Sequence, residues 1–170
     1  FMMIVGLGTE NDPLYLPLQT RSRQVIPNAV PPPIPPDILR GFDANLRNQF
    51  PNIELRSLSG TYNCIGMVFA FRRPAIDPEH IQLILNGDGY RRVRNEAEVV
   101  FGDVVLYRYR TSYMHAGVVM ERISVPESAS FDFMVLSKWG DQGGEYLHRF
   151  RDVPDTFGDI VEFWTERRPR

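Results

Sequence analysis

Apolar residues recur every four positions between residues 37 and 50, which predicts a first helix. The face that this spacing would bury carries Ile38, Phe42, Leu46 and Phe50. Proline has no N–H for a helix interior, so we expect Pro51 to end the segment. The pattern therefore predicts one amphipathic helix whose four apolar side chains turn toward a core.

Two shorter helices are predicted after the first. One begins near Tyr62-Asn63-Cys64, and its apolar positions are Ile65, Val68 and Phe69. The other has a clear start, with Asp77 as N-cap and Pro78 at the first helical position. Its apolar stripe is Ile81, Ile84 and Leu85, and Asn86-Gly87 is expected to end it.

From Gly102 onward the apolar spacing changes to two, which is the period of a β-strand. Five strands are predicted, at residues 104–109, 115–120, 131–139, 146–150 and 160–164. Turns are expected near Glu127 and at Gly143-Gly144. Helices followed by a run of short strands indicate an α+β domain, in which helices pack on a five-stranded antiparallel sheet.

Composition and charge narrow the class of protein. The 170 residues are 43% hydrophobic and 24% charged, which is typical of one globular domain. The formal net charge of −2 argues against wholesale nucleic-acid binding, because such proteins usually carry an excess of Lys and Arg. No apolar run reaches the ~18 residues of a membrane span, so we expect a soluble protein.

The chain is predicted to divide into a proline-rich N-terminal arm, residues 1–36, and a main domain, residues 37–170. The end of the arm should run extended as polyproline II, because prolines surround Ile34 at Pro31, Pro32, Pro33, Pro35 and Pro36. Two interpretations stay open for this segment. It is a stiff connector or wrapping arm, or it binds a protein partner that recognises proline.

Cys64 is the first candidate for chemistry. It is the single cysteine, so the chain forms no internal disulfide and no cysteine-based metal cage, and no cofactor is implied. A helix N-terminus favours the thiolate, so we expect a partly accessible thiol with a pKa below the free value of ~8.5. The other interpretation is a buried and inert cysteine.

His115 is the candidate base among the histidines, which are His80, His115 and His148. It opens the second predicted strand, and the small residues Ala116 and Gly117 leave room for another group beside its ring. An imidazole next to a thiol can take its proton. We therefore predict a catalytic pair of Cys64 and His115, against the alternative of a packed histidine.

A third member of the site is predicted from the strand register. A hairpin centred near Glu127 would place Ser137 on the face of His115, and the turn at Gly143-Gly144 would bring Trp139 or Lys138 opposite His148. A slip of one residue would put Lys138 on that face instead of Ser137. We favour His148 as the group that orients His115, because a neutral imidazole can accept an N–H and Lys⁺ cannot. Ser137 is the next choice.

These motifs resemble the papain-like, NlpC-type thiol hydrolases. In that group a Gly-Asp-apolar strand precedes a strand opened by the catalytic histidine, as do Gly102-Asp103-Val104 and His115-Ala116-Gly117 here. A closer resemblance is to a mainly bacterial papain-like family, and it runs from about Asp37 to Trp164. The matching residues are Tyr62-Asn63-Cys64-Ile65, His115-Ala116, Ser137-Lys138-Trp139-Gly140 and His148.

The resemblance implies a cysteine hydrolase that acts on an amide, thioester or ester of a peptide, protein or other substrate. The N–H of Cys64, with Tyr62 or Asn63 as a second donor, would form the oxyanion hole. Deamidation and acyl transfer use the same pair and stay open. Such domains also occur as delivered bacterial toxins, so the expected location is cytoplasmic or reached through a secretion system. The NlpC group has Asp where this chain has Asn63, so a cell-wall substrate is not implied.

The alternative is a non-catalytic binding module on the same fold. Thiol reactivity separates the two, because a paired and accessible cysteine alkylates quickly at neutral pH and a core cysteine does not.

Overall fold

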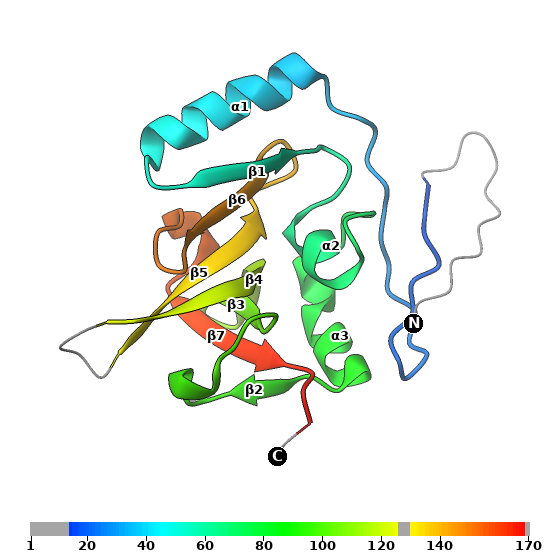
Figure 1. The fold of residues 1–170 in the computed structure, drawn as a ribbon. Helices are drawn as coiled ribbons and strands as arrows, with labels where there is room; N and C mark the ends of the chain where they lie inside the picture. The colour runs from blue at the N-terminus through cyan, green and yellow to red at the C-terminus, as the bar shows by residue number, and fades with distance from the viewer. Residues whose placement is uncertain (1–13, 126–129, 169–170) are drawn as a thin grey trace.

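Seven antiparallel strands form one sheet in the computed structural model, which describes residues 14–125 and 130–168 (Figure 1). The order across the sheet is β1-β6-β5-β4-β3-β7-β2. The strands are β1 Glu54–Leu58, β2 Arg91–Val93, β3 Val104–Tyr109, β4 Ser112–Ser124, β5 Phe131–Lys138, β6 Gly144–Arg149 and β7 Ile160–Thr165. The helices are α1 Pro36–Gln49, α2 Cys64–Phe69 and α3 Ile81–Asp88, with short 3₁₀ turns η1 Pro78–His80, η2 Glu96–Glu98 and η3 Asp155–Phe157.

The expectation of a five-stranded sheet is wrong. All five predicted strands are present as β3 to β7, and β1 and β2 add one strand at each end of the sheet. Both are short edge strands, Glu-Leu-Arg-Ser-Leu and Arg-Arg-Val, and each pairs on one side only. Three to five residues with few apolar positions show no period of two, so their pattern predicts no strand. The turn expected near Glu127 lies outside the described residues, as does the start of the arm, residues 1–13.

Helix α1 confirms the first predicted helix and the second half of its predicted face, since Leu46 and Phe50 pack against a core cluster, but not the first half. Ile38 and Phe42 are 45% and 43% exposed, whereas Leu39 and Asp43 are buried. The carboxylate of Asp43 accepts the hydroxyl of Tyr146 at 3.1 Å and pairs with Arg47 at 2.7 Å. These polar partners decide which face of the helix turns inward, and apolar spacing carries no information about them.

Helices α2 and α3 confirm the other two predicted helices and lie together on one side of the sheet (Figure 1). Helix α3 ends at Gly89, whose φ of +73° favours glycine, two residues beyond the predicted end. Gly66 lets α2 approach the chain after it, because a Cβ there would lie 1.6 Å from the carbonyl oxygen of Pro74. The core on this side contains Leu18, Ile26, Cys64, Ile65, Ala70, Ile76, Ile81, Ile84, Leu85, Val104, Leu106 and Ala116.

The other face of the sheet carries a second core. Val105 and Tyr107 alternate along β3 with Val104 and Leu106, so the two pairs point to opposite faces. The second core contains Val93, Val99, Val105, Tyr107, Val119, Phe133, Val135, Phe150 and Phe163. A smaller cluster of Ile53, Trp139 and Tyr146 adjoins α1 and η3, with Phe50 and Phe157 packed against it.

The described part of the arm runs extended alongside α2 and α3 (Figure 1). Leu18 and Ile26 belong to the helix-side core, and Ala29 forms an isolated bridge with Ala75. The prolines at 32, 33 and 35 are exposed, and a partner for them stays a prediction. None of the helices in the described ranges has the length and apolar character needed to cross a membrane.

Candidate functional site

Asn63 fixes the start of α2, where the thiol sits. Its side-chain oxygen accepts the N–H of Gly66 at 2.9 Å and the N–H of Ile76 at 3.1 Å. Its amide nitrogen donates to the carbonyl of Ile76 at 2.7 Å. An N-cap asparagine satisfies N–H groups that the helix itself leaves free. The residue predicted as an oxyanion donor therefore caps the helix and ties it to the segment before η1.

Cys64 begins α2 as predicted, but its environment differs from the expectation. The residue is only 7% exposed, and burial raises the pKa of the thiol to about 11. The backbone N–H groups of Ala116, Ile65 and Cys64 itself oppose that shift by favouring the thiolate. The expectation of an accessible thiol with a lowered pKa is wrong, because desolvation outweighs the helix start. At neutral pH the sulfur carries its proton.

The thiol lies beside the peptide that follows His115. The backbone N–H of Ala116, the next residue of β4, is near enough to favour the thiolate of Cys64. Among the described residues no hydrogen bond joins the thiol to the imidazole. The ring of His115 instead stacks on Phe157, with centroids 3.7 Å apart and planes 14° apart. The fold thus brings Cys64 beside Ala116 in β4, while Phe157 packs on the imidazole. The strand begins at Ser112, so the expectation that His115 opens it is wrong.

His115 is a neutral base in this setting. Burial first, and His148 second, lower the pKa of its imidazole well below 6.5. Its Nε2 is buried and has no hydrogen-bond partner among the described residues. His115 lies opposite Tyr107 and its ring turns to the face of the second core. Cys64 instead packs with Ala116 and Leu106 on the helix side. The imidazole and the thiol therefore lie on opposite faces of the sheet, and the predicted pairing of the two side chains is not formed.

Ser137 and His148 form a buried network on the side of the sheet that holds Trp139. Ser137 Oγ lies 2.7 Å from Nε2 of His148 and accepts the indole N–H of Trp139 at 3.0 Å. Nδ1 of His148 lies 2.8 Å from the carbonyl oxygen of Arg149. Only a protonated Nδ1 can donate to that oxygen, so Nε2 accepts the proton of Ser137. Burial lowers the pKa of His148 to about 4.

The register of β5 and β6 differs from the prediction. Val135 lies opposite His148 and Lys138 lies opposite Glu145, so the expected pairing of Trp139 or Lys138 with His148 is wrong. His148 still reaches Ser137, because side chains two residues apart share a face. Neither Ser137 nor His148 is hydrogen-bonded to His115. Their role in orienting His115 stays a prediction.

Lys138 organises the turn between β5 and β6. Its ammonium donates to the carbonyl oxygens of Gly140, Asp141 and Gly143 at 2.7, 3.1 and 2.7 Å. Burial lowers its pKa to about 8, so it is charged at neutral pH. The nitrogen lies 5.5 Å from the ring centre of Tyr62. Lys138 therefore places a fixed positive charge near the start of α2 and away from His115.

Tyr62 is engaged elsewhere. Its hydroxyl donates to Glu145 at 2.6 Å, and Arg72 pairs with the same carboxylate at 2.6 Å. Burial first, and the hydrogen bond with Glu145 second, raise the pKa of Tyr62 to about 12. The predicted oxyanion donor is therefore a partner of Glu145. The sequence carries no signal for Glu145, Arg72 or the stacking of Phe157, because all three depend on contacts between distant segments.

Within the described ranges, no three His, Cys, Asp or Glu side chains come together as metal ligands would. Comparison of the chain with protein families, curated proteins and solved structures gives no match. The function is therefore argued from the geometry of the residues around Cys64 alone.

Proposed function

We propose that the chain is a cysteine-dependent hydrolase of the amidase or peptidase type, with Cys64 as nucleophile and His115 as base. The position of Cys64 at the start of α2, packed in the same core as Ala116, the residue after His115, carries this proposal. It places the single thiol of the chain next to the backbone of His115, which is the fourth residue of β4 and not its first as predicted, with the imidazole on the opposite face.

The chemistry begins from two neutral groups. The step requires the His115 ring to leave Phe157 and turn to the face of Cys64. There it would take the proton of the thiol as the sulfur attacks the carbonyl carbon of the substrate, and return that proton to the leaving group. The N–H groups at the start of α2 and the ammonium of Lys138 favour the negative charge that develops on the substrate oxygen. Water then hydrolyses the acyl-enzyme. Hydrogen bonds of this kind are often loose before substrate binds and tighten in its complex.

The test is a single-turnover acylation followed by intact-protein mass spectrometry. Wild type is mixed at pH 7.5 with p-nitrophenyl acetate and with an acyl thioester. The expected product is one acyl group on Cys64, absent from Cys64→Ser. His115→Gln should slow acylation by about 10²-fold or more, because it removes the base. His80→Gln is the matched control and should react like wild type.

Two outcomes contradict the hydrolase. One is that the folded wild type gains no acyl group from either reagent. The other is that His115→Gln reacts as fast as wild type, which would leave the thiol acting without a base.

A non-catalytic binding module is the second candidate. The burial of Cys64 and the stacking of His115 on Phe157 favour it, because a packed thiol and a packed imidazole need no chemistry to explain them. On this view the folded protein resists acylation, and Cys64→Ala lowers its stability through the cavity that it leaves.

A further inference from the structure

A pocket of about 610 Å³ opens at the β2 edge of the sheet, and arginines dominate its wall. Its lining consists of Arg91, Ala97, Glu98, Val100, Arg122, Arg167 and Arg168. The residues come from four separate segments, which are β2, η2 with the loop after it, β4 and the end of the described chain. Folding therefore gathers four guanidinium groups from three distant parts of the sequence.

Backbone carbonyls hold these guanidinium groups in place. Arg91 donates to the carbonyl of Arg167 at 3.0 Å, and Arg122 donates to the carbonyl of Ala97. Arg167 donates to the carbonyl of Glu98 at 2.9 Å. A carbonyl positions a cation without cancelling its charge. These contacts therefore orient three positive groups, and those of Arg91 and Arg122 do so without pairing them with a carboxylate.

The carboxylates nearby balance only part of this charge. Arg167 pairs with Asp103 at 2.8 Å, and Glu98 lies on the pocket wall. Arg168 has no partner among the described residues. Four arginines face two carboxylates, so two positive charges remain.

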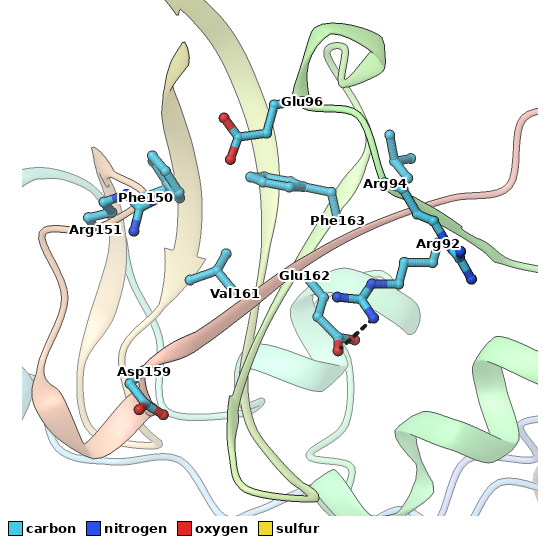
Figure 2. Close-up of a pocket in the computed structure, with 10 residues that line it drawn as sticks. Arg92, Arg94, Glu96, Phe150, Arg151, Asp159, Val161, Glu162 and Phe163 are labelled. Carbon is cyan, nitrogen blue, oxygen red and sulfur yellow. Dashed lines mark ion pairs between the residues drawn. The ribbon is translucent and has the colours of Figure 1, made fainter. Parts of the chain in front are cut away.

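A neighbouring pocket that also borders β2 is different (Figure 2). It gathers Arg92, Arg94 and Arg151 but matches them with Glu96, Asp159 and Glu162. Figure 2 shows Arg92 turned toward Glu162, with which it pairs at 3.5 Å. The charged residues that line it are equal in number, three of each sign, whereas those that line the arginine pocket are four arginines and one glutamate.

We propose that the arginine pocket of Arg91, Arg122, Arg167 and Arg168 binds a phosphate group. Guanidinium forks match the geometry of phosphate oxygens and bind them through paired hydrogen bonds. The ligand is a soluble phosphate compound or an anionic lipid head group. Val100, which lines the pocket, and Phe101, which follows it, are 38% and 69% exposed. These two side chains form an apolar surface that lipid acyl chains could contact. The proposal is independent of Cys64.

The experiment has one arm for each source. In the first arm, inorganic pyrophosphate is titrated into the protein at constant ionic strength and followed by the backbone NMR signals of Ala97 and Glu98. In the second arm, the protein is sedimented with phosphatidylcholine vesicles with and without 30% phosphatidic acid, on the order of one anionic lipid in three. Both arms compare wild type with Arg122→Gln/Arg168→Gln. The control is Arg40→Gln/Arg73→Gln, which removes the same charge from exposed positions on and after the distant helices α1 and α2.

We expect saturable binding in at least one arm, weakened about 10-fold or more in Arg122→Gln/Arg168→Gln and unchanged in the control. Binding of pyrophosphate without vesicle sedimentation identifies a soluble phosphate ligand, and sedimentation with phosphatidic acid alone identifies a lipid head group. The proposal is overturned if neither arm shows binding. It is also overturned if both double variants lose binding equally, since net charge alone would then explain the result.

Discussion

Ser137 Oγ lies 2.7 Å from Nε2 of His148, and both side chains are fully buried. The same oxygen accepts the indole N–H of Trp139, so one hydroxyl serves two buried partners. Neither partner can turn to solvent if the hydroxyl is removed. The pair therefore holds β5 to β6 by a polar contact inside an otherwise apolar layer.

Ser137→Ala should lower the free energy of unfolding by about 1–3 kcal/mol, because it leaves the N–H of Trp139 without an acceptor and Nε2 of His148 without a donor. Urea denaturation followed by tryptophan fluorescence measures the change. Ser112→Ala, at an exposed position of β4, is the matched control and should stay within about 0.5 kcal/mol of wild type. Equal stabilities for the two variants would show that the network contributes nothing.

Stability should fall as the pH drops from 6.5 toward 4. The folded protein holds His148 neutral with a pKa of about 4, and burial lowers the pKa of His115 in the same direction. Between pH 4 and pH 6.5 the unfolded chain binds more protons than the folded protein, so the free energy of unfolding rises with pH. His148 alone accounts for roughly 3 kcal/mol of stability that is fully present above pH 6.5 and lost at pH 4.

Urea denaturation at several pH values from 4 to 7.5 measures this dependence. His148→Gln should show a shallower slope than wild type, since one of the two buried imidazoles is gone. His80→Gln, at a partly exposed position on η1, controls for loss of a histidine as such. A wild-type stability that is flat over this range would contradict the buried, neutral state of both rings.

Iodoacetamide should label native Cys64 slowly. With a pKa of about 11, the thiolate fraction at pH 8 is lower than that of a free cysteine by more than about 10²-fold, and the sulfur is also shielded. Labelling in 6 M guanidinium, about the concentration that unfolds even very stable domains, should be fast. Mass spectrometry over time gives both rates. Slow labelling is the behaviour of a core cysteine and supports the non-catalytic module, whereas rapid labelling of the folded protein would support the catalytic pair.

Lys138 is the single lysine of the chain and is fully buried, so amine reagents should reach it only after unfolding. Lys138→Met should lower the free energy of unfolding by about 2 kcal/mol or more, because three carbonyl oxygens of the turn lose their shared donor. Acetic anhydride labelling mapped by peptide mass spectrometry tests the first statement, and urea denaturation tests the second. Acetylation of Lys138 in the folded protein would show that the turn opens.

Several features follow from local pattern. The start of α2 at Cys64 can be predicted from the sequence because Asn63 is a good N-cap. The strand at Val104–Tyr109 can be predicted because its residues have a strong β pattern between turns. The resemblance to NlpC-type hydrolases and the pairing of Cys64 with His115 come from motif order, and they stay predictions to be tested by acylation. Length and net charge set the class of one globular domain.

Tertiary contacts decided the rest. Asp43 is buried in place of Phe42 because the hydroxyl of Tyr146, a hundred residues away, meets its carboxylate. The short edge strands exist only because β6 and β7 offer them partners. The pKa of the Cys64 thiol is higher than its position at a helix start predicts. Burial destabilises the thiolate more than the nearby backbone N–H groups stabilise it. Sequence patterns report local preference, whereas desolvation and pairing depend on which distant residues the fold brings together.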